Sequence, residues 1–378
     1  MKPPDGEPGR VGRGAAPHER IRVLVVEDSG FMRGVLRHIL TSDPQMEVVG
    51  VAADGLQAVE GVAALAPHVV TMDVEMPRAD GLSAVARIMA DRPTPILMFS
   101  SHTRDGSAAA IRALELGAVD FVPKPAGGAD VALETLRETI LGKVRMAARV
   151  RPIRTVGLTG EGRVREHSPR RSEPGRRPAA TDACVVIAAS TGGPAALLRL
   201  VPALPADFPA PVLIVQHMPA PYTTQLAREL AARSALVVRE AEAGERLAPG
   251  VVHVAPGSRD LTVTSGRLIG LGPTAGDGGS PSADLALASV ARAAGAAGVA
   301  VVLTGMGTDG ARGADAIARA GGRVLVQDEA SSASWGMPRA ALETGCVNAV
   351  VSLGELAETV VACLDDPAAY RDGLRHAS

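Results

Sequence analysis

Five polar side chains in the N-terminal half have the chemical types that hold a phosphoryl group and a hard cation. Each directly follows an apolar run that is typical of a β-strand; they are Glu27, Asp28, Asp73, Ser100 and Lys124. If these strands are parallel, their carboxyl ends meet at one edge of the sheet and the three carboxylates lie together. Crowded carboxylates need a cation, and an all-oxygen anionic site suits Mg²⁺. We therefore expect Asp73 to attack a phosphoryl group, with Ser100 and Lys124 holding its oxygens.

A second set of reactive groups follows apolar runs in the C-terminal half. Ser190 lies in Ala-Ser-Thr-Gly-Gly-Pro, His217 in Gln-His-Met-Pro, and Asp309 in Gly-Met-Gly-Thr-Asp-Gly. At one sheet edge these side chains can act as a nucleophile, a general base and the group that orients the base. The glycines on both sides of Met306 allow its backbone N–H to point at an oxyanion. The sequence therefore predicts a serine hydrolase.

Taken alone, each of these residues has a simpler interpretation. The residues of the first set can be helix caps or solvated loop charges. Ser190 lies in a glycine-rich turn of a kind that more often binds phosphate or simply turns, and Ala188 replaces the first glycine of the G-x-S-x-G nucleophile elbow. An isolated histidine after a strand, such as His217, is more often structural. The catalytic interpretation requires that all residues of a set lie together at the carboxyl ends of the strands of one sheet.

The elements that must position the first set alternate between strand-like and helical patterns. We expect strands over 21–26, 47–52, 69–72, 95–99 and 119–122, with helices near 31–41, 55–65, 81–90, 107–116 and 131–150. This alternation predicts a parallel sheet that is covered by helices on both faces. Residues 21–150 are therefore expected to form a flavodoxin-like (βα)5 domain.

The same alternation returns over residues 182–364. We expect strands over 183–188, 212–216, 236–238, 299–304, 323–326 and 349–351. The shorter runs 251–255, 261–264 and 267–271 are separated by Gly-Ser and Ser-Gly turns and predict a small antiparallel meander. The second domain is therefore expected to be a doubly wound, mainly parallel α/β domain with a hairpin excursion.

The remaining segments have the composition of chain without a packed core. Residues 1–20 are rich in Pro, Gly and Arg and predict a disordered extension, and residues 365–378 are interpreted as a tail. Residues 151–181 are rich in Arg and Pro without periodicity and predict a linker. The positive charge of this linker can serve to bind an acidic partner or only to keep a tether in solution.

Composition argues against several other classes of protein. The net charge of −2 gives no general attraction to nucleic acid or membrane, and no helix-turn-helix pattern follows the first domain. No apolar run reaches the ~18 residues of a membrane-spanning helix, and the N-terminus lacks a signal peptide's apolar stretch. The 3 cysteines are far apart and lack metal-ligand spacing. They predict a reduced, cytoplasmic protein.

The first domain resembles the receiver domains of two-component response regulators. The resemblance rests on Val-Val-Glu-Asp-Ser, Met-Asp-Val-Glu-Met-Pro-Arg-Ala-Asp-Gly-Leu, Met-Phe-Ser-Ser and Phe-Val-Pro-Lys-Pro. It implies that Asp73 accepts phosphate from a histidine kinase, with Mg²⁺ held at the three carboxylates. It also implies a switch in which Ser100 turns toward the phosphate and the aromatic ring of Phe121 reorients, next to Lys124.

The second domain resembles the catalytic domain of the chemotaxis protein-glutamate methylesterases. Beyond the motifs of the three reactive residues, the resemblance includes Leu-Pro-Ala-Asp-Phe-Pro, Val-His-Val-Ala-Pro-Gly, Gln-Asp-Glu-Ala-Ser-Ser and Trp-Gly-Met-Pro-Arg-Ala-Ala. It implies hydrolysis of glutamyl γ-methyl esters on the signalling helices of chemoreceptors, without a cofactor, and deamidation of specific receptor glutamines. It also implies that the unphosphorylated receiver packs over the active site and partly blocks it.

The resemblance implies partners and leaves some questions open. We expect a monomer whose partners are a chemotaxis-type histidine kinase and methyl-accepting chemoreceptors, without nucleic acid binding or membrane insertion. Residues 258–260 and 285–287 depart modestly from the family, whereas 281–284 between them keep its Pro-Ser-x-Asp pattern. These positions are expected to line the substrate groove, which leaves receptor preference open. Two alternatives also remain: a phosphorylation-gated adaptor without activity, and a hydrolase of another acyl substrate in a different two-component pathway.

Overall fold

The structure is a computed structural model, and it describes residues 20–76, 81–100, 103–124, 130–150, 182–274, 281–366 and 375–376. The predicted extension over 1–19, the linker over 151–181 and most of the predicted tail lie outside the described residues. Residue 20, the last residue of the predicted extension, is the first residue that the structure describes. Within the predicted tail, Arg375–His376 form a short strand, β15, that pairs in parallel with β14 (Ala349–Val351).

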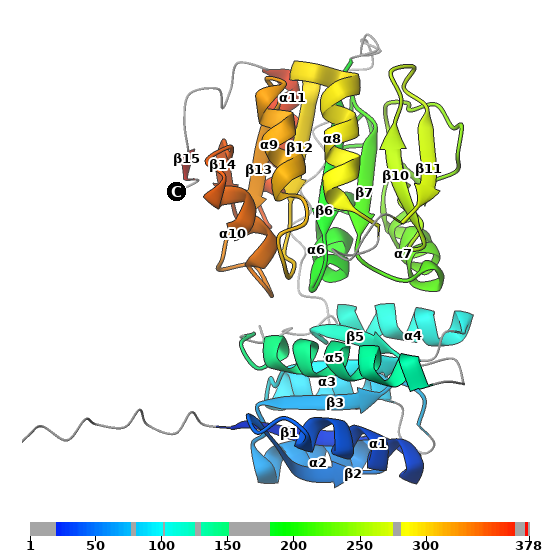
Figure 1. The fold of residues 1–378 in the computed structure, drawn as a ribbon, viewed down its shortest axis with the longest axis vertical. Coiled ribbons are helices and arrows are strands. Elements are labelled where there is room, and N and C mark those ends of the chain that lie inside the picture. The colour runs from blue at the N-terminus through cyan, green and yellow to red at the C-terminus, as the bar shows by residue number, and fades with distance from the viewer. Residues whose placement is uncertain are drawn as a thin grey trace, which may run out of the picture.

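The N-terminal domain is a parallel sheet flanked by helices, which confirms the predicted flavodoxin-like fold (Figure 1). The sheet has the order β2-β1-β3-β4-β5, from β1 (Ile21–Val26), β2 (Met46–Ala52), β3 (Val69–Asp73), β4 (Ile96–Ser100) and β5 (Asp120–Pro123). The helices are α1 (Gly30–Thr41), α2 (Gly55–Leu65), α3 (Gly81–Asp91), α4 (Arg104–Glu115) and α5 (Asp130–Ala147). This strand order places β1 beside β3, so the residues that follow them share one edge.

Helix α4 begins three residues before the predicted start at residue 107. Thr103 is its N-cap residue, and the Thr103 side chain accepts a hydrogen bond from the Gly106 N–H. A threonine hydroxyl satisfies a backbone N–H group that the first turn of a helix leaves unpaired. The cap therefore sets the start of α4, whereas the apolar periodicity becomes visible only further along the helix.

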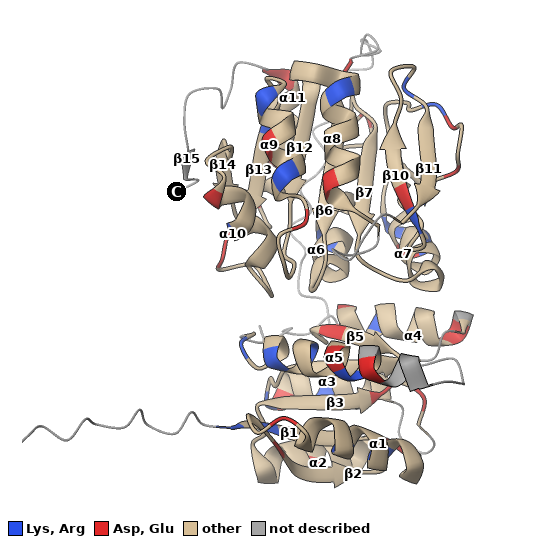
Figure 2. Ribbon diagram, in the orientation of Figure 1, with Lys and Arg blue, Asp and Glu red and all other residues tan. Residues whose placement is uncertain are grey.

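The C-terminal domain is built on a second parallel sheet, as predicted. Its order is β15-β14-β13-β12-β6-β7-β9-β8, with β6 (Cys184–Ala189), β7 (Val212–Gln216), β8 (Val237–Glu240), β9 (Val251–Val254), β12 (Gly298–Val302) and β13 (Arg323–Gln327). Its helices are α6 (Gly193–Leu200), α7 (Ala220–Arg233), α8 (Ala283–Ala294), α9 (Ala311–Arg319), α10 (Gly336–Glu343) and α11 (Leu356–Asp365). The central strands β6, β7 and β12 carry no charged residues (Figure 2). Charged residues lie on helices, on loops and on the other strands β8, β10 (Arg259–Val263) and β13.

Alternate residues of β6 enter two separate apolar cores, one on each face of the sheet. Val185 and Ile187 pack in the core that α6, α7 and α11 cover. Val186 and Ala188 pack in the core that α8, α9 and α10 cover. A strand that is buried on both faces reads as a continuous apolar run, as Cys-Val-Val-Ile-Ala-Ala does.

The predicted three-stranded antiparallel meander is wrong in one strand. β9 does not join the excursion, because it pairs in parallel with β7 on one side and with β8 on the other. Only β10 (Arg259–Val263) and β11 (Ile269–Pro273) form an antiparallel pair. Residues Val252 to Val254 are fully buried, and a strand that is covered on both faces belongs inside a sheet rather than in a hairpin at its border.

The two domains contact each other through α4 and β5 of the first and α6 and α7 of the second (Figure 1). One apolar core includes residues from both sides of this contact, among them Phe121 and Tyr222. In the part of the chain that is described, no helix is both long enough and apolar enough to span a membrane.

Candidate active site

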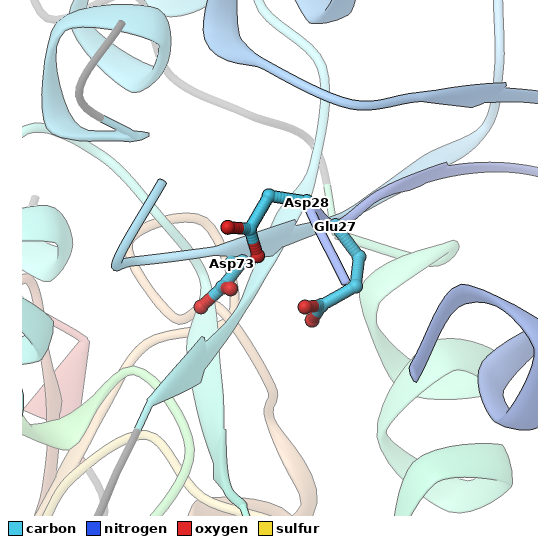
Figure 3. A group of neighbouring side chains, drawn as sticks. All are labelled: Glu27, Asp28 and Asp73. Atoms are coloured by element: carbon cyan, nitrogen blue, oxygen red, sulfur yellow. The ribbon is translucent and has the colours of Figure 1, made fainter. Parts of the chain in front are cut away.

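Three carboxylates come together at the carboxyl ends of β1 and β3, as the sequence predicts. One oxygen from each of Glu27, Asp28 and Asp73 can be chosen so that all lie within 4.8 Å of one another (Figure 3). Glu27 and Asp73 are buried, whereas Asp28 is exposed at the mouth of the pocket. A donor set made only of carboxylate oxygens fits a hard cation such as Mg²⁺.

Lys124 supplies the positive charge next to these carboxylates. Its Nζ lies 2.7 Å from Asp73 Oδ2 and 3.1 Å from Glu27 Oε2. Burial, and after it the charge of Asp73, raise the pKa of Glu27 to about 7, although Lys124 acts in the opposite direction. One ammonium therefore does not fully compensate three carboxylates, and the pocket favours an additional cation.

The two expected switch residues lie at the contact between the domains. The Ser100 hydroxyl donates to the Gly106 carbonyl oxygen at 2.7 Å, and Ser100 itself is fully buried. The ring of Phe121 stacks on the ring of Tyr222, with 4.3 Å between centroids. Tyr222 belongs to α7 of the second domain, and its hydroxyl donates to the Ser100 carbonyl oxygen at 3.4 Å. Both residues thus contact Tyr222 of the other domain.

Ser190 lies in the tight turn between β6 and α6. Its N–H donates to the Thr304 carbonyl oxygen at 3.1 Å, which ties the turn to the end of β12. Gly192 has φ +76°, and a Cβ there would lie 2.6 Å from the Ala333 Cβ. A Cβ on Gly193 would collide with Gln216 Oε1 and lie 2.8 Å from the Ala189 Cβ. The glycine pair is therefore required for the turn that presents Ser190.

His217 and Asp309 form a direct pair, with 2.8 Å between His217 Nε2 and Asp309 Oδ2. Both are nearly buried. Burial opposes ionisation of Asp309, but hydrogen bonds from His217 and from the N–H groups of Ala283 and Asp284 hold the pKa of its carboxyl below its usual value. The ionised carboxylate can therefore stabilise a positive charge on the His217 ring.

Ser190 and His217 follow paired residues of neighbouring strands, since Ala189 of β6 is in register with Gln216 of β7. The described residues show no hydrogen bond between the Ser190 hydroxyl and the His217 ring. Catalytic hydrogen bonds of this kind often tighten only when substrate binds. Because Asp309 contacts Nε2, the nitrogen available to Ser190 is Nδ1. This is the reverse of the arrangement in the chymotrypsin-type triad.

The Met306 N–H lies in a loop that touches Ser190. A Cβ placed on the neighbouring Gly305 would lie 2.9 Å from the Ser190 Cβ and would also collide with Met337. Gly307, on the other side, has φ +80°. Among the described residues the Met306 N–H has no hydrogen-bond partner, so it remains available to a substrate oxygen, as an oxyanion donor must be.

Comparison with known proteins identifies both domains. The family described as CheB methylesterase matches residues 185–360, and the response regulator receiver domain matches residues 23–135. A protein-glutamate methylesterase/protein-glutamine glutaminase of Pyrococcus horikoshii is 43% identical over 350 residues, which cover 92% of this chain and 94% of that protein. The chain belongs to the CheB methylesterase family.

Further relatives of the same name extend the comparison. The protein of Symbiobacterium thermophilum is 42% identical, covering 92% of this chain and 98% of its own. A crystal structure of the Thermotoga maritima CheB methylesterase catalytic domain matches 48% of this chain and 97% of that chain, at 37% identity and a TM-score of 0.46.

Gln216 is a residue of this CheB methylesterase site that the sequence did not single out. Its Nε2 donates to the carbonyl oxygens of Ser190 (2.8 Å) and His217 (3.2 Å). Two acceptors on this nitrogen fix the orientation of the amide. Gln216 therefore holds together the backbones that carry the proposed nucleophile and base. Its position directly before His217 in Gln-His-Met-Pro was the available signal.

Two of the residues 281–284, which are expected at the substrate groove, contact Asp309 or the helix that begins after it. The Ser282 hydroxyl lies 3.4 Å from Asp309 Oδ1, and Ser282 N–H donates to the buried Asp260 at 2.7 Å. The Asp284 carboxylate is buried and accepts hydrogen bonds from the start of α9. Residue 260, in the other segment expected at the groove, is likewise turned inward. Ser282 and Asp284 thus lie around Asp309, and the placement of these residues at a substrate groove stays a prediction.

The receiver covers the strand ends of the second domain. A cavity of about 360 Å³ lies between the domains, lined by receiver residues such as Phe121 and Lys143 and by His217 of the second domain. Asp120 of β5 accepts hydrogen bonds from Thr191 Oγ1 and Lys143 Nζ, both at 2.8 Å. Thr191 directly follows Ser190, so the receiver is bonded to the turn that carries the proposed nucleophile.

Proposed function

We propose that this chain is a protein-glutamate methylesterase that is activated by phosphorylation and acts on chemoreceptors. Its relatives carry the name protein-glutamate methylesterase/protein-glutamine glutaminase, and their similarity extends over 92% of the chain, which includes both the receiver and the methylesterase domain. The observation that carries the proposal is the ionised Asp309 paired with His217 beside Ser190, under a receiver that touches the Ser190 turn.

The hydrolysis follows from the geometry of three side chains. The Ser190 hydroxyl attacks the ester carbonyl while His217 Nδ1 accepts its proton, and Asp309 stabilises the imidazolium through Nε2. The Met306 N–H stabilises the negative charge that develops on the carbonyl oxygen. His217 then returns the proton to the leaving methoxide, so methanol departs and Ser190 remains acylated. His217 next takes a proton from a water molecule, whose oxygen attacks the acyl carbon. The bond from this carbon to Ser190 Oγ breaks, His217 returns the proton to Oγ, and the glutamate is released.

A glutamine side chain can follow the same route. The amide replaces the ester, and His217 protonates the departing nitrogen so that ammonia leaves in place of methanol. Both reactions pass through the same acyl-enzyme on Ser190 and yield the same glutamate product. No cofactor is proposed for either hydrolysis.

Phosphorylation is proposed at Asp73. One Asp73 oxygen attacks the phosphorus of a phosphohistidine on the kinase, the P–N bond breaks, and the kinase histidine leaves as the acyl phosphate forms. Lys124 Nζ, which now contacts Asp73 at 2.7 Å, moves to a phosphoryl oxygen. Mg²⁺ held by Glu27, Asp28 and Asp73 would neutralise phosphoryl charge when bound. Ser100 exchanges its bond to the Gly106 carbonyl for a bond to the phosphoryl group.

The receiver is proposed to restrain the hydrolase until Asp73 is phosphorylated. Movement of Ser100 and Phe121 disturbs the Tyr222 stack, and with it the contact that closes the strand ends. A histidine kinase of the chemotaxis type supplies the phosphoryl group, and the cytoplasmic helices of methyl-accepting chemoreceptors are the substrate. We propose that the chain works in the cytoplasm as a monomer, without binding nucleic acid or inserting into a membrane.

Mass spectrometry of methylated chemoreceptor peptides tests this function directly. The full chain with Mg²⁺ and acetyl phosphate should convert methylated glutamates to glutamate and release methanol, and Ser190→Ala should not. A folded, phosphorylated chain that leaves every methyl ester intact contradicts the proposal. It would favour the adaptor or a hydrolase of another acyl substrate.

A further inference from the structure

Asp309 is held by the first turn of α8 as well as by His217. Besides contacting the ring, Asp309 Oδ2 accepts a hydrogen bond from the Ala283 N–H at 2.8 Å. Asp309 Oδ1 accepts from the N–H groups of Asp284 (2.9 Å) and Gly310 (3.0 Å). Ala283 and Asp284 begin α8, and their N–H groups have no partner within the helix. The place of the Asp309 carboxylate is therefore tied to the N-terminus of α8.

Asp284 makes the reciprocal connection to α9. Its Oδ1 accepts from the N–H groups of Gly310 (2.9 Å) and Gly313 (2.8 Å), and its Oδ2 from Arg312 Nε (2.8 Å). Gly310 is the N-cap residue of α9 and has no side chain that could cap the helix. Asp284 supplies that cap from the neighbouring helix. Asp309 thus caps α8, the helix that contains Asp284, and Asp284 caps α9, the helix that begins just after Asp309.

The two caps meet at the backbone immediately after Asp309. The Gly310 N–H is shared between Asp284 Oδ1 and Asp309 Oδ1. The loop that leads to Asp309 contains Gly305 and Gly307, so its backbone is poorly restrained by side chains. The hydrogen bond from Gly310 to Asp284 therefore restrains the backbone directly next to Asp309, where a backbone movement would displace the Asp309 side chain most.

Helix α8, which carries Asp284, packs closely against α9, from whose N–H groups the Asp284 carboxylate accepts hydrogen bonds. A Cβ on Gly313 of α9 would lie only 2.5 Å from the Leu287 Cβ of α8, so the two helices are in close contact at their first turns. The Asp284 side chain is 11% exposed, whereas its ion-pair partner Arg312 is 89% exposed. An ion pair with an exposed arginine contributes little. The two backbone hydrogen bonds, rather than the ion pair, are therefore the main contribution of Asp284 to the first turn of α9.

We propose that Asp284 is a positioning residue for hydrolysis. By capping α9 it places the Asp309 carboxylate, and through that carboxylate it sets the orientation of the His217 ring. The inference rests on the proposed roles of Ser190, His217 and Asp309. Asp284 touches neither substrate nor reacting atoms, so its loss should act on kcat and leave KM nearly unchanged.

The test compares Asp284→Ala, Asp284→Asn and Arg312→Ala in the full, phosphorylated chain, with methanol release from a methylated receptor peptide as the assay. Asp284→Ala should lower kcat about 10- to 100-fold, the loss expected for a misplaced catalytic group, with KM within about twofold. Asp284→Asn keeps an oxygen that can accept both N–H groups and should recover most of that loss. Arg312→Ala removes only the ion pair and should retain at least about half of kcat.

Two further measurements separate positioning from general stability. Asp284→Ala should shift the rise of kcat with pH to lower pH, because a displaced Asp309 supports the charged His217 ring less well. In an Asp309→Ala background, removing Asp284 should cost almost nothing more, because the residue through which it acts is already absent.

Several outcomes overturn the inference. One is a lower melting temperature for Asp284→Ala with an unchanged kcat per folded molecule and an unchanged pH profile, which means a structural role only. Another is a loss of kcat on removal of Asp284 that is equally large in the original chain and in the Asp309→Ala variant. If Asp309→Ala itself is fully active, the proposed triad fails first. If Asp284→Ala does not fold, Asp284→Ser removes the long acceptor while keeping a helix-compatible hydroxyl, and the same comparisons apply.

Discussion

At the scale of single residues, His217 divides its two ring nitrogens between different tasks. Nε2 contacts Asp309 at 2.8 Å, and Nδ1 is left for the Ser190 proton. Gln216 bonds the backbone carbonyls of both Ser190 and His217, so the backbones that carry the two side chains are tied together. A catalytic triad loses nearly all its activity when its nucleophile or its base is removed.

We therefore predict strongly non-additive losses within the triad. Ser190→Ala should reduce methanol release by several orders of magnitude, and Ser190→Ala/His217→Ala should be hardly slower than Ser190→Ala. The measurement is single-turnover methanol release by the folded variants. Substantial turnover by Ser190→Ala would remove it as the nucleophile.

Asp73 is predicted to be the phosphoacceptor, because its carboxylate lies between two other acids and the ammonium of Lys124. Asp73→Asn should abolish Mg²⁺-dependent labelling by radioactive acetyl phosphate. Asp105→Asn, which changes an exposed acid in the first turn of α4, serves as the matched control and should label normally. Undiminished labelling of Asp73→Asn would show that another residue accepts the phosphoryl group.

Glu27 makes the stability of the metal-free receiver depend on pH. Its pKa is raised to about 7 from its ordinary value of 4.5. Between these two pH values the folded protein therefore holds a proton that the unfolded chain has lost. The free energy of unfolding should therefore fall as pH rises from 4.5 to 7. Mg²⁺ favours the ionised carboxylates and should raise the melting temperature more at pH 8 than at pH 5.

Glu27→Gln is the control for this pH dependence, since it removes the titrating group and nearly preserves the shape. The fall in unfolding free energy should be reduced in this variant, as measured by denaturant titration at each pH. An equal Mg²⁺ effect at both pH values in the original chain would contradict a cation at these carboxylates.

At the scale of elements, the reactive groups depend on the turns that follow β6, β7 and β12. The turn after β6 is tight, because Gly192 and Gly193 lie against Ala333, Gln216 and Ala189. Side chains at these positions would push the turn away from its neighbours. The strand ends bring the reactive groups to one edge, and the turns set their final places.

Gly193→Ala should therefore damage both stability and activity. The added Cβ collides with Gln216 Oε1, and we expect a cost of about 1–3 kcal/mol together with a lower kcat. Gly34→Ala on the exposed face of α1 has no atom within 4 Å of the new Cβ and should be stabilising by about 0.5–1 kcal/mol. Melting temperature and methanol release for the two variants test the contrast. Equal behaviour would show that the close approach at Gly193 is not required.

At the scale of the whole molecule, the receiver and the hydrolase are joined through a small set of contacts. Phe121 stacks on Tyr222, Thr191 bonds Asp120, and Arg233 of α7 pairs with Glu115 of α4. Domains of one chain have a high effective concentration for each other, so even weak contacts are substantially formed. Loss of only ~1–3 kcal/mol of coupling changes an equilibrium about 5- to 150-fold.

The isolated domain that begins at residue 182 should therefore be faster than the unphosphorylated full chain. We expect a difference within about 5- to 150-fold in methanol release, and the difference should shrink when the full chain is phosphorylated. Glu115→Ala, which breaks one contact across the interface, should raise the basal rate of the full chain modestly. A folded isolated domain that is as slow as the unphosphorylated chain would mean that phosphorylation acts by substrate capture or by realigning the catalytic residues.

The sequence by itself determined the two parallel sheets and the residues that follow their strands. Apolar runs and helical periodicity are local properties, and parallel strands bring their carboxyl ends to one edge whatever the details of packing. Glu27, Asp28 and Asp73 could therefore be grouped, and so could Ser190, His217 and Asp309. The same local reasoning misplaced β9, because a short apolar run fits either a hairpin or a central strand.

Only the tertiary structure decided how these groups are oriented. The choice of Nε2 for Asp309, the cap that Asp284 places on α9 and the stack of Phe121 on Tyr222 join residues that are distant in the chain. Periodicity does not report such contacts, because they depend on the angle and distance between packed elements rather than on spacing along one of them. The residue types for chemistry were therefore readable in the sequence, whereas their mutual positioning came from the packing of α8 on α9 and of the receiver on the hydrolase.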